Sequence, residues 1–246
     1  MAVLGIDIGG SGIKGALVDT ETGELVTERL RIPTPQPATP KAVIKTMKKI
    51  VKHFNYSGPV GVGIPAIVIN GVVKSAANID DGWIGFPGRQ AMAEATGCDV
   101  KLMNDADVAG VAEMTFGAGK DQKGVVMIFT LGTGVGSVMF VNGQIVPNLE
   151  LGHLYLRDQK FDAEEFMSDR IRKEDKLTWN KWGKRLTTYF RHIEFLFSPE
   201  LIIIGGGISK KHEKFIHLIN IYADVVPAQL LNEAGIIGAA VSAGSK

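Results

Sequence analysis

The sequence predicts an α/β protein for which two compact lobes are an open option, and three observations lead to this. The chain has 246 residues, 45% of them apolar, and a mean hydropathy of +0.12, which is enough apolar material for one or two cores. Strand and helix patterns alternate along it, as in α/β folds. Gly10 and Gly12 recur as Gly134 and Gly136, an offset of 124 residues that is close to half the chain and indicates an internal duplication.

Charge and cysteine content exclude several classes of protein. The 27 basic and 26 acidic residues give a net charge of +1, which argues against a general nucleic-acid binder. The single cysteine, Cys98, cannot form an intrachain disulfide or build a zinc site by itself. The first residues carry Asp7 and no basic region, unlike a signal peptide. No apolar run approaches the ~20 residues that span a bilayer, so we expect a cytoplasmic protein that contacts no membrane.

The first half of the chain contains three predicted strands, a helix, two further strands and a second helix. Two short apolar segments flank a glycine-rich turn and predict a hairpin. A proline-rich loop then precedes a helix that places Val43, Met47 and Ile50 on one face. The predicted strands are 3–8, 13–18, 24–32, 58–68 and 100–104, and the predicted helices are 41–54 and 105–116.

The second half begins with the same hairpin pattern and then diverges from a simple copy. Strands at 125–131 and 137–141 flank a second glycine-rich turn, and 201–204 is a further buried strand. A long amphipathic helix at 179–197 directs its aromatic residues toward a core. We also expect helices at 210–222 and 232–243.

The two glycine-rich turns suggest a polyanion held from two sides. Glycine lets backbone N–H groups approach a phosphate closely and adopt the positive φ values that direct them at it. Lys14 would add a charge. The same pattern is typical of ordinary tight turns, and each turn leads into a strand, unlike a Walker A loop or a dinucleotide fingerprint. The turn residues are Gly9, Gly10, Ser11 and Gly12, then Gly132, Thr133, Gly134 and Gly136.

Acidic and amide side chains follow two of the predicted strands. Asp7 ends an apolar strand, where a carboxylate would suit Mg²⁺ held through water beside phosphate oxygens, or would be an exposed strand-end acid. Asn104 and Asp105 end another strand, where open α/β sheets place ligands. Asp105 could accept a proton from a substrate hydroxyl that Asn104 orients. The alternative is that this pair caps the following helix.

Glu150 and His153 lie in a segment without a strong helix or strand pattern. A carboxylate and an imidazole side by side on a loop are good hydrogen-bond partners for a polyol. Ordinary surface residues would give the same pattern.

Five motifs together resemble the ROK family of sugar kinases and repressors, within the actin-like ATPase superfamily. They occur in the family's order and span nearly the whole chain. The motifs are Asp7-Ile8-Gly9-Gly10-Ser11-Gly12-Ile13-Lys14, Asn104-Asp105-Ala106, Leu131-Gly132-Thr133-Gly134-Val135-Gly136-Ser137, Glu150-Leu151-Gly152-His153 and Gly205-Gly206-Gly207-Ile208-Ser209.

The resemblance implies a two-lobed actin-like (ribonuclease H-like) duplicated fold with a central cleft, and a homodimer. The smaller lobe would be 1–105 plus 233–246, and the larger 106–232. Asp105 would be the general base of phosphoryl transfer. Asn78, Asn104, Asp105, Glu150, His153 and Glu164 would bind sugar, and both turns with Gly205, Gly206 and Gly207 would hold the donor.

One departure from the family concerns zinc. Many members follow the histidine with a cysteine-rich zinc-binding stretch, whereas residues 154–166 contain no cysteine. We therefore expect Mg²⁺ but no zinc, with His153 a sugar ligand only. The glutamate that closes this stretch corresponds to Glu164, although Glu165 beside it leaves the register open.

Cysteine-free members of this kind resemble polyphosphate-dependent glucokinases, which implies glucose as acceptor and inorganic polyphosphate, with or without ATP, as donor. Segment 170–191 holds eight basic residues and two acidic ones. On the predicted helix at 179–197, Lys181, Lys184 and Arg185 lie opposite the aromatic face. Such a basic stripe could guide a chain of phosphates, or be a solvated helix face.

Other functions remain open at this point. A strictly ATP-dependent hexokinase of the same fold, acting on glucose, mannose or a related sugar, is the main alternative. A sugar-responsive repressor would need a helix-turn-helix segment before the first turn, which here begins at residue 9. A sugar sensor or a structural actin-like protein would have no need for an Asp105 beside Asn104.

Overall fold

The computed structural model describes residues 1–76, 79–156 and 160–244. The chain forms two compact units. One comprises Met1–Ala112 together with Glu233–Lys246, and the other comprises Glu113–Asn232. The lobe division after residue 105 that the resemblance implies stays a prediction.

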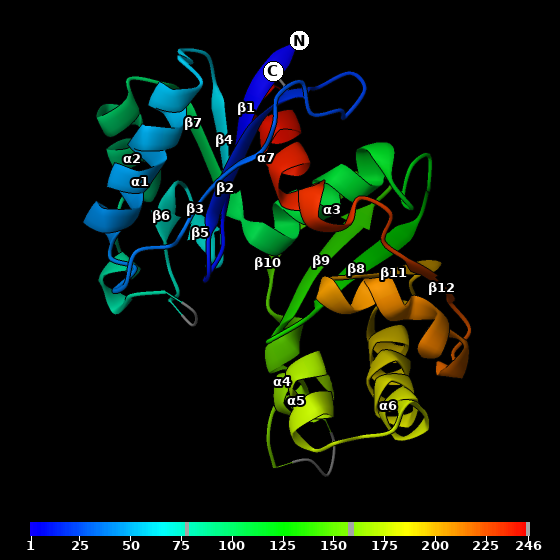
Figure 1. Cartoon of the computed structure of the whole chain (residues 1–246). Helices are drawn as coiled ribbons and strands as arrows, with labels where there is room; N and C mark the ends of the chain where they lie inside the picture. The colour runs from blue at the N-terminus through cyan, green and yellow to red at the C-terminus, as the bar shows by residue number, and fades with distance from the viewer. Residues whose placement is uncertain (77–78, 157–159, 245–246) are drawn as a thin grey trace. The chain divides into compact units, whose positions relative to one another are not determined.

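The first unit is built on a five-stranded sheet (Figure 1). Its strands are β1 (Ala2–Ile8), β2 (Ile13–Asp19), β3 (Leu30–Ile32), β4 (Val60–Ile64) and β7 (Val100–Asn104), in the spatial order β3-β2-β1-β4-β7. The β1–β2 and β2–β3 pairs are antiparallel, whereas β4 and β7 run parallel to β1. The carboxyl ends of β1, β4 and β7 therefore meet at one edge, where Asp7 pairs with Gly63 and Gly63 with Met103.

Helices cover both faces of this sheet. α1 (Pro40–His53) and α2 (Gly88–Thr96) lie on one side, and α7 (Ala234–Gly244) crosses β1 and β4 on the other (Figure 1). The core includes Ile6, Met47, Ile50, Val62 and Trp83, all fully buried. The remaining elements are β5 (Val68–Ile69), β6 (Val72–Val73), η1 (Asp81–Trp83), η5 (Leu231–Glu233) and α3 (Asp105–Phe116), which starts in this unit and ends in the other.

Glycines allow α7 to lie directly on the sheet. A Cβ atom at Gly61 would overlap the carbonyl oxygen of Ala239, and one at Gly5 would overlap that of Ile236. On the helix side, a Cβ at Gly238 would overlap the carbonyl oxygen of Val108 in α3. The contacts are backbone against backbone, so only residues without side chains fit there.

The second unit repeats the topology of the first. Its strands are β8 (Val125–Leu131), β9 (Val135–Val141), β10 (Gln144–Leu149), β11 (Leu201–Gly205) and β12 (Asp224–Pro227), in the order β10-β9-β8-β11-β12. Again two antiparallel pairs precede two parallel ones. The identical strand order and directions agree with the internal duplication that the glycine spacing predicts.

The second unit's core lies between its sheet and α6 (Trp179–Phe197). Phe129 of β8 meets Tyr189 and Phe190 at ring-centroid distances of 5.7 and 5.2 Å. The indole N–H of Trp182 donates to the carbonyl oxygen of Met167 at 2.8 Å, which fixes α6 against α4. The other helices are η2 (Leu151–His153), α4 (Ala163–Met167), α5 (Asp169–Glu174), η3 (Gly207–Lys214) and η4 (Ile216–Leu218).

Some predicted elements are wrong in extent or type. The strand expected at 24–32 is confined to Leu30–Ile32, preceded by an isolated bridge from Leu25 to Val18. The helix expected at 210–222 is replaced by η3 and η4, which Phe215 separates at φ −143°. Phe215 is fully buried, with its ring 4.8 Å from that of Trp182, so packing overrides the local helical pattern. Among the described residues, no helix is both long and apolar enough to cross a lipid bilayer.

Candidate functional site

Asn104 and Asp105 stand at the carboxyl edge of the first sheet, where β7 ends and α3 begins. The side-chain oxygen of Asn104 accepts from the backbone N–H groups of Ala106, at 2.7 Å, and Asp107, at 3.2 Å. Its amide nitrogen donates to the carbonyl oxygen of Ala66 at 3.3 Å. Asn104 therefore caps α3, as the structural alternative predicts. Asp105 lies in the first turn of α3, where the helix dipole favours a carboxylate.

Asp7 lies at the same edge, in β1. Its carboxylate accepts from the Lys14 ammonium at 2.9 Å, and only 16% of its side chain is exposed. Strand pairing places Asp7 two strands from Met103, a separation of about 10 Å at ordinary strand spacing. Much of the positive charge of Lys14 is thus offset by Asp7. No cluster of three or more metal-binding side chains occurs within the described part of the chain.

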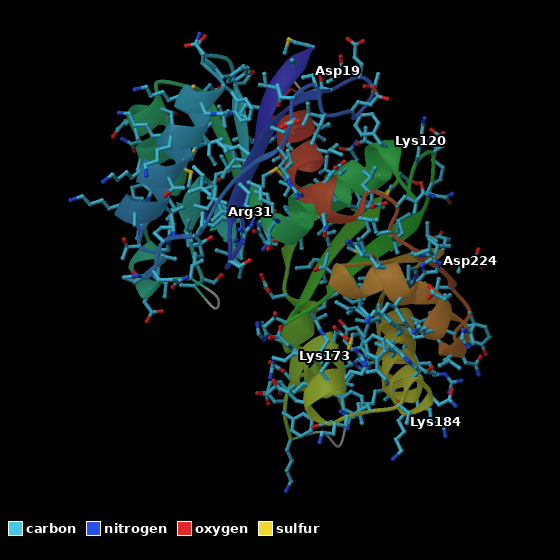
Figure 2. The ribbon with its side chains drawn as sticks, in the orientation of Figure 1. Asp19, Arg31, Lys120, Lys173, Lys184 and Asp224 are labelled. Atoms are coloured by element: carbon cyan, nitrogen blue, oxygen red, sulfur yellow. The ribbon has the colours of Figure 1, made fainter. Side chains whose placement is uncertain are left out.

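The first glycine-rich turn is held by two residues that the sequence reasoning missed. The guanidinium of Arg31, a residue labelled in Figure 2, donates to the carbonyl oxygen of Ser11 at 2.7 Å. It occupies the space that a side chain at Gly12 would need. The hydroxyl of Thr34 donates to the carbonyl oxygen of Gly9. Lys14 and Arg31 are register partners in β2 and β3, so both lie on one face of the sheet.

The second glycine-rich turn has the same kind of support. A carboxylate oxygen of Glu164 accepts from the N–H of Val135 at 2.9 Å and fills the space beside Gly134. The Arg170 side chain donates to the carbonyl oxygen of Thr133 at 3.2 Å, while its backbone N–H donates to Gly132. Arg31 and Arg170 therefore bind the carbonyl oxygens of corresponding turns in the two units, and sequence reasoning identified neither.

The backbone of these turns corrects one expectation. We expected positive φ values at the turn glycines, but Gly9, Gly10, Gly12, Gly132, Gly134 and Gly136 do not have them. At Gly12 and Gly134 a side chain would displace the ends of the Arg31 and Glu164 side chains, which occupy that space.

The third glycine segment lies beside the second turn. β11 runs parallel to β8 with Gly205 opposite Thr130, so both strands end at one edge of the second sheet. Gly206 has φ +82°, and a Cβ atom there would lie 2.5 Å from the carbonyl oxygen of Leu131. Gly132 and Gly207 have open space around their Cα atoms. Such an edge presents backbone N–H groups to an anion.

His153 pairs with an acid that the sequence reasoning also missed. Its Nδ1 lies 2.8 Å from Oδ2 of Asp162, and this hydrogen bond, the main cause, raises the pKa of His153. Half of the His153 side chain is exposed, so its other ring nitrogen can contact a ligand. Asp162 also caps α4 by accepting from the N–H of Glu165.

Glu150 and Glu164 lie close enough to His153 to influence it. Burial raises the pKa of Glu150, with a smaller lowering by His153 and a further rise from Glu164. Glu164 therefore acts electrostatically on both Glu150 and His153, whereas Glu165 is exposed. A half-buried set of two carboxylates and an imidazole can donate to and accept from the hydroxyls of a sugar.

Only part of the basic stripe of α6 is available to bind a ligand, because Arg185 is engaged by other residues. Arg185 donates to the carbonyl oxygen of Phe166 at 3.0 Å and to Asp175 at 3.1 Å. Lys181 and Lys184 are exposed, and Figure 2 shows Lys184 projecting from α6. Asn78, the remaining predicted sugar ligand, lies outside the described residues.

Comparison with known proteins gives consistent matches. The model of the ROK family matches residues 3–165. The chain is 46% identical to the polyphosphate glucokinase of Mycobacterium tuberculosis over 97% of its length and 89% of that protein. It is 26% identical to the glucokinase of Streptomyces coelicolor, over 96% of each.

Solved structures agree with these matches. The inorganic polyphosphate/ATP-glucomannokinase of Arthrobacter sp. strain KM is 46% identical, with a TM-score of 0.91 over 98% of this chain and 97% of that one. A ROK family glucokinase from Streptomyces griseus, solved with glucose and AMPPNP, shares the fold at a TM-score of 0.84 and 23% identity, over 99% of both chains.

Proposed function

This chain belongs to the ROK family, and from that premise we propose that it is a glucokinase that transfers a phosphoryl group from inorganic polyphosphate to the 6-hydroxyl of glucose. The observation that carries the proposal is the 46% identity, over nearly the full chain, to a polyphosphate glucokinase. The retained pair of Asn104 and Asp105 at a sheet edge supports it, because phosphoryl transfer to a hydroxyl needs a base there.

In this proposal Asp105 accepts the proton of the sugar 6-hydroxyl as the phosphoryl group arrives. Positioned general bases contribute about 10²- to 10⁴-fold to such reactions. Asn104 directs most of its polar atoms to α3 and Ala66, so its main part would be to fix the backbone that carries Asp105. Its second amide hydrogen would be available to the sugar.

Glu150, His153 and Glu164 would bind the other sugar hydroxyls. Asp162 holds Nδ1 of His153, which directs Nε2 toward a ligand. Glu164 already accepts from the backbone of the second turn, so it would link sugar binding to the geometry of the turn that holds the donor.

The donor would be held by the two glycine-rich turns and by Gly205, Gly206 and Gly207, with Lys181 and Lys184 near a longer chain of phosphates. Asp7 is a suitable residue to hold Mg²⁺ through water, because Mg²⁺ usually takes one or two carboxylates and completes its shell with water and substrate phosphates. Bound Mg²⁺ would supply charge neutralisation for the phosphate oxygens. Lys14, already paired with Asp7, would complement that charge.

The experiment that tests the function compares initial rates with long-chain polyphosphate and with ATP on glucose, mannose and other hexoses. We expect polyphosphate-supported turnover of glucose. Turnover with ATP alone would favour the strictly ATP-dependent hexokinase, and binding of sugar without turnover would favour a sensor. A cytoplasmic location and a homodimeric state are further predictions.

A further inference from the structure

We propose that the outer face of α1 binds the distal part of a long polyphosphate chain, an inference that rests on the proposed function. The face consists of Lys41, Lys45, Lys48, Lys49 and Lys52, here called the α1 lysine face. It belongs to the first unit and is separate from the basic stripe of α6.

The five lysines form one continuous band. At 100° per residue they fall within an arc of about 100°, and from Lys41 to Lys52 they extend about 16 Å along the axis. All five are exposed, and nitrogen-tipped side chains project from the outer side of α1 in Figure 2. The opposite side is buried through Val43, Met47 and Ile50.

Helix stability does not account for this arrangement. Lys41 with Lys45, Lys45 with Lys49, and Lys48 with Lys52 are like-charge pairs at i,i+4 spacing, and each destabilises a helix by a few tenths of a kcal/mol. Lys41 also stands in the first turn, where the helix dipole disfavours a cation. A band kept at a cost to stability is better explained by a bound polyanion.

The positive charge of the first unit is also concentrated on α1 rather than spread evenly over the unit. The first unit has twelve basic and twelve acidic residues, and five of the twelve basic ones lie on this helix, which contains no acid. None of the five is in an ion pair found among the described residues. Of the acids on neighbouring elements, Asp80 accepts from the N–H of Gly82, and Glu94 accepts from Gln90 on α2.

The band starts near the first glycine-rich turn. Thr34 is bound to Gly9 of that turn, and six residues lie between it and Lys41, so the two are at most about 25 Å apart. The other end of α1 lies near the start of β1, because Tyr56 donates to the carbonyl oxygen of Ala2. A polyanion bound at the turn and about 25 Å or more in length can therefore reach Lys41 and continue along α1.

The test replaces Lys41, Lys45, Lys48 and Lys52 together by Gln in the full chain. The matched control replaces Lys74, Lys101, Lys120 and Lys123, which are also exposed, and so makes the same change in net charge. Michaelis constants are measured with long-chain polyphosphate, tripolyphosphate and ATP, at low and high salt. Thermal unfolding shows whether each variant is folded.

We expect the α1 variant to raise the Michaelis constant for long-chain polyphosphate about tenfold at low salt, from four screened attractions. The effect should shrink at high salt, while tripolyphosphate and ATP values change less than about twofold. Because like charges are removed, the unfolding temperature should stay the same or rise.

Three results would overturn the proposal. An unchanged Michaelis constant for long-chain polyphosphate in the α1 variant would mean that the α1 lysine face is only a solvated surface. Equal changes in the Michaelis constants for long and short donors, or the same change in the control variant, would also contradict it. Stronger binding of the parent to duplex DNA than to polyphosphate, lost in the variant, would instead make the face a nucleic-acid surface. Which phosphoryl donor the enzyme uses is tested separately, on the unsubstituted parent protein. A parent that uses ATP but not polyphosphate contradicts the proposed function before the variants are compared.

Discussion

Adjacent residues at the end of β7 have different roles. Asn104 is buried, and its side chain is engaged by the backbone of α3 and by Ala66, whereas Asp105 is less buried and lies at the start of the helix. The side chain of Asn104 thus fixes the turn that carries the proposed base, and one carboxylate oxygen of Asp105 also accepts from the N–H of Ala106 at 2.8 Å. The main cap of α3 and the proposed base are therefore neighbouring side chains.

Replacing Asp105 by Asn should therefore abolish most turnover while preserving the fold. The amide keeps the shape of the carboxylate but cannot accept the proton, so we expect a loss of at least about 10²-fold in kcat. Glucose binding measured by calorimetry and the unfolding temperature should stay near the parent values. Turnover within about fivefold of the parent would contradict the role of general base.

The His153–Asp162 pair predicts how glucose binding depends on pH. Asp162→Asn removes the carboxylate whose hydrogen bond, and secondly whose charge, raises the pKa of His153, so protonation of His153 should require a lower pH. The pH dependence of the Michaelis constant for glucose should shift to lower pH, with kcat at saturating glucose little changed. Asp162→Glu should restore part of the shift, and Glu165→Gln on the same helix is the control.

The His153–Asp162 pair also makes the stability of the fold depend on pH. Since its pKa is raised in the folded state, protonated His153 adds stability below the ordinary histidine pKa, and this contribution is lost as the pH rises through the raised value. In Asp162→Asn the unfolding temperature should depend less on pH in that window. An unchanged pH dependence would mean that Asp162 only caps α4.

The site residues that the sequence identified differ from those it missed in the kind of contact they make. Asp7, Asp105 and the glycine turns are marked by their place at the ends of apolar strands, which is a local pattern. Arg31, Arg170 and Asp162 act through contacts that depend on strand register or on packing between helices. A single sequence does not encode those contacts in any short window.

At the scale of elements, α7 depends on glycines in the strands beneath it. Gly61→Ala would place a methyl group into the backbone of Ala239, which cannot move without shifting the helix. We expect a loss of about 3 kcal/mol in the free energy of unfolding, measured by urea denaturation. Gly10→Ala, which meets nothing within 4 Å, should leave stability nearly unchanged, and equal losses in both would contradict this view.

Helix boundaries were predictable where pattern and cap agree. α6 spans the expected residues 179–197 because Thr178 caps it, and its aromatic face repeats at helical spacing. The segment after Gly207 has a similar helical pattern, but the burial of Phe215 between Trp179 and Trp182 bends it into two short helices. α2 and β12 were not predicted, since neither has a strong periodic signal.

For the whole molecule, metal dependence is the broadest prediction. We expect purified protein to contain no stoichiometric zinc, because Cys98 is buried and no other thiol exists. EDTA should stop turnover, and Mg²⁺ should restore it, without a change in the unfolding temperature. Elemental analysis showing one zinc per chain would contradict the first part, and unfolding by EDTA would contradict the second.

The duplication was the part of the architecture most visible in the sequence. Two glycine pairs at matched positions predicted it, and the two sheets share one strand order. The strand orders themselves were not predictable, because the parallel pairing of β4 and β11 with the hairpins joins segments separated by long insertions.

The return of α7 to the first sheet has a consequence for synthesis on the ribosome. Residues 113–232 are continuous and can close as soon as they emerge, but β1 and β4, made early, lack their covering helix until the chain passes residue 233. The unit translated first is therefore the one completed last. Its apolar strands are exposed through most of elongation, which makes this half the expected client of chaperones that bind nascent chains.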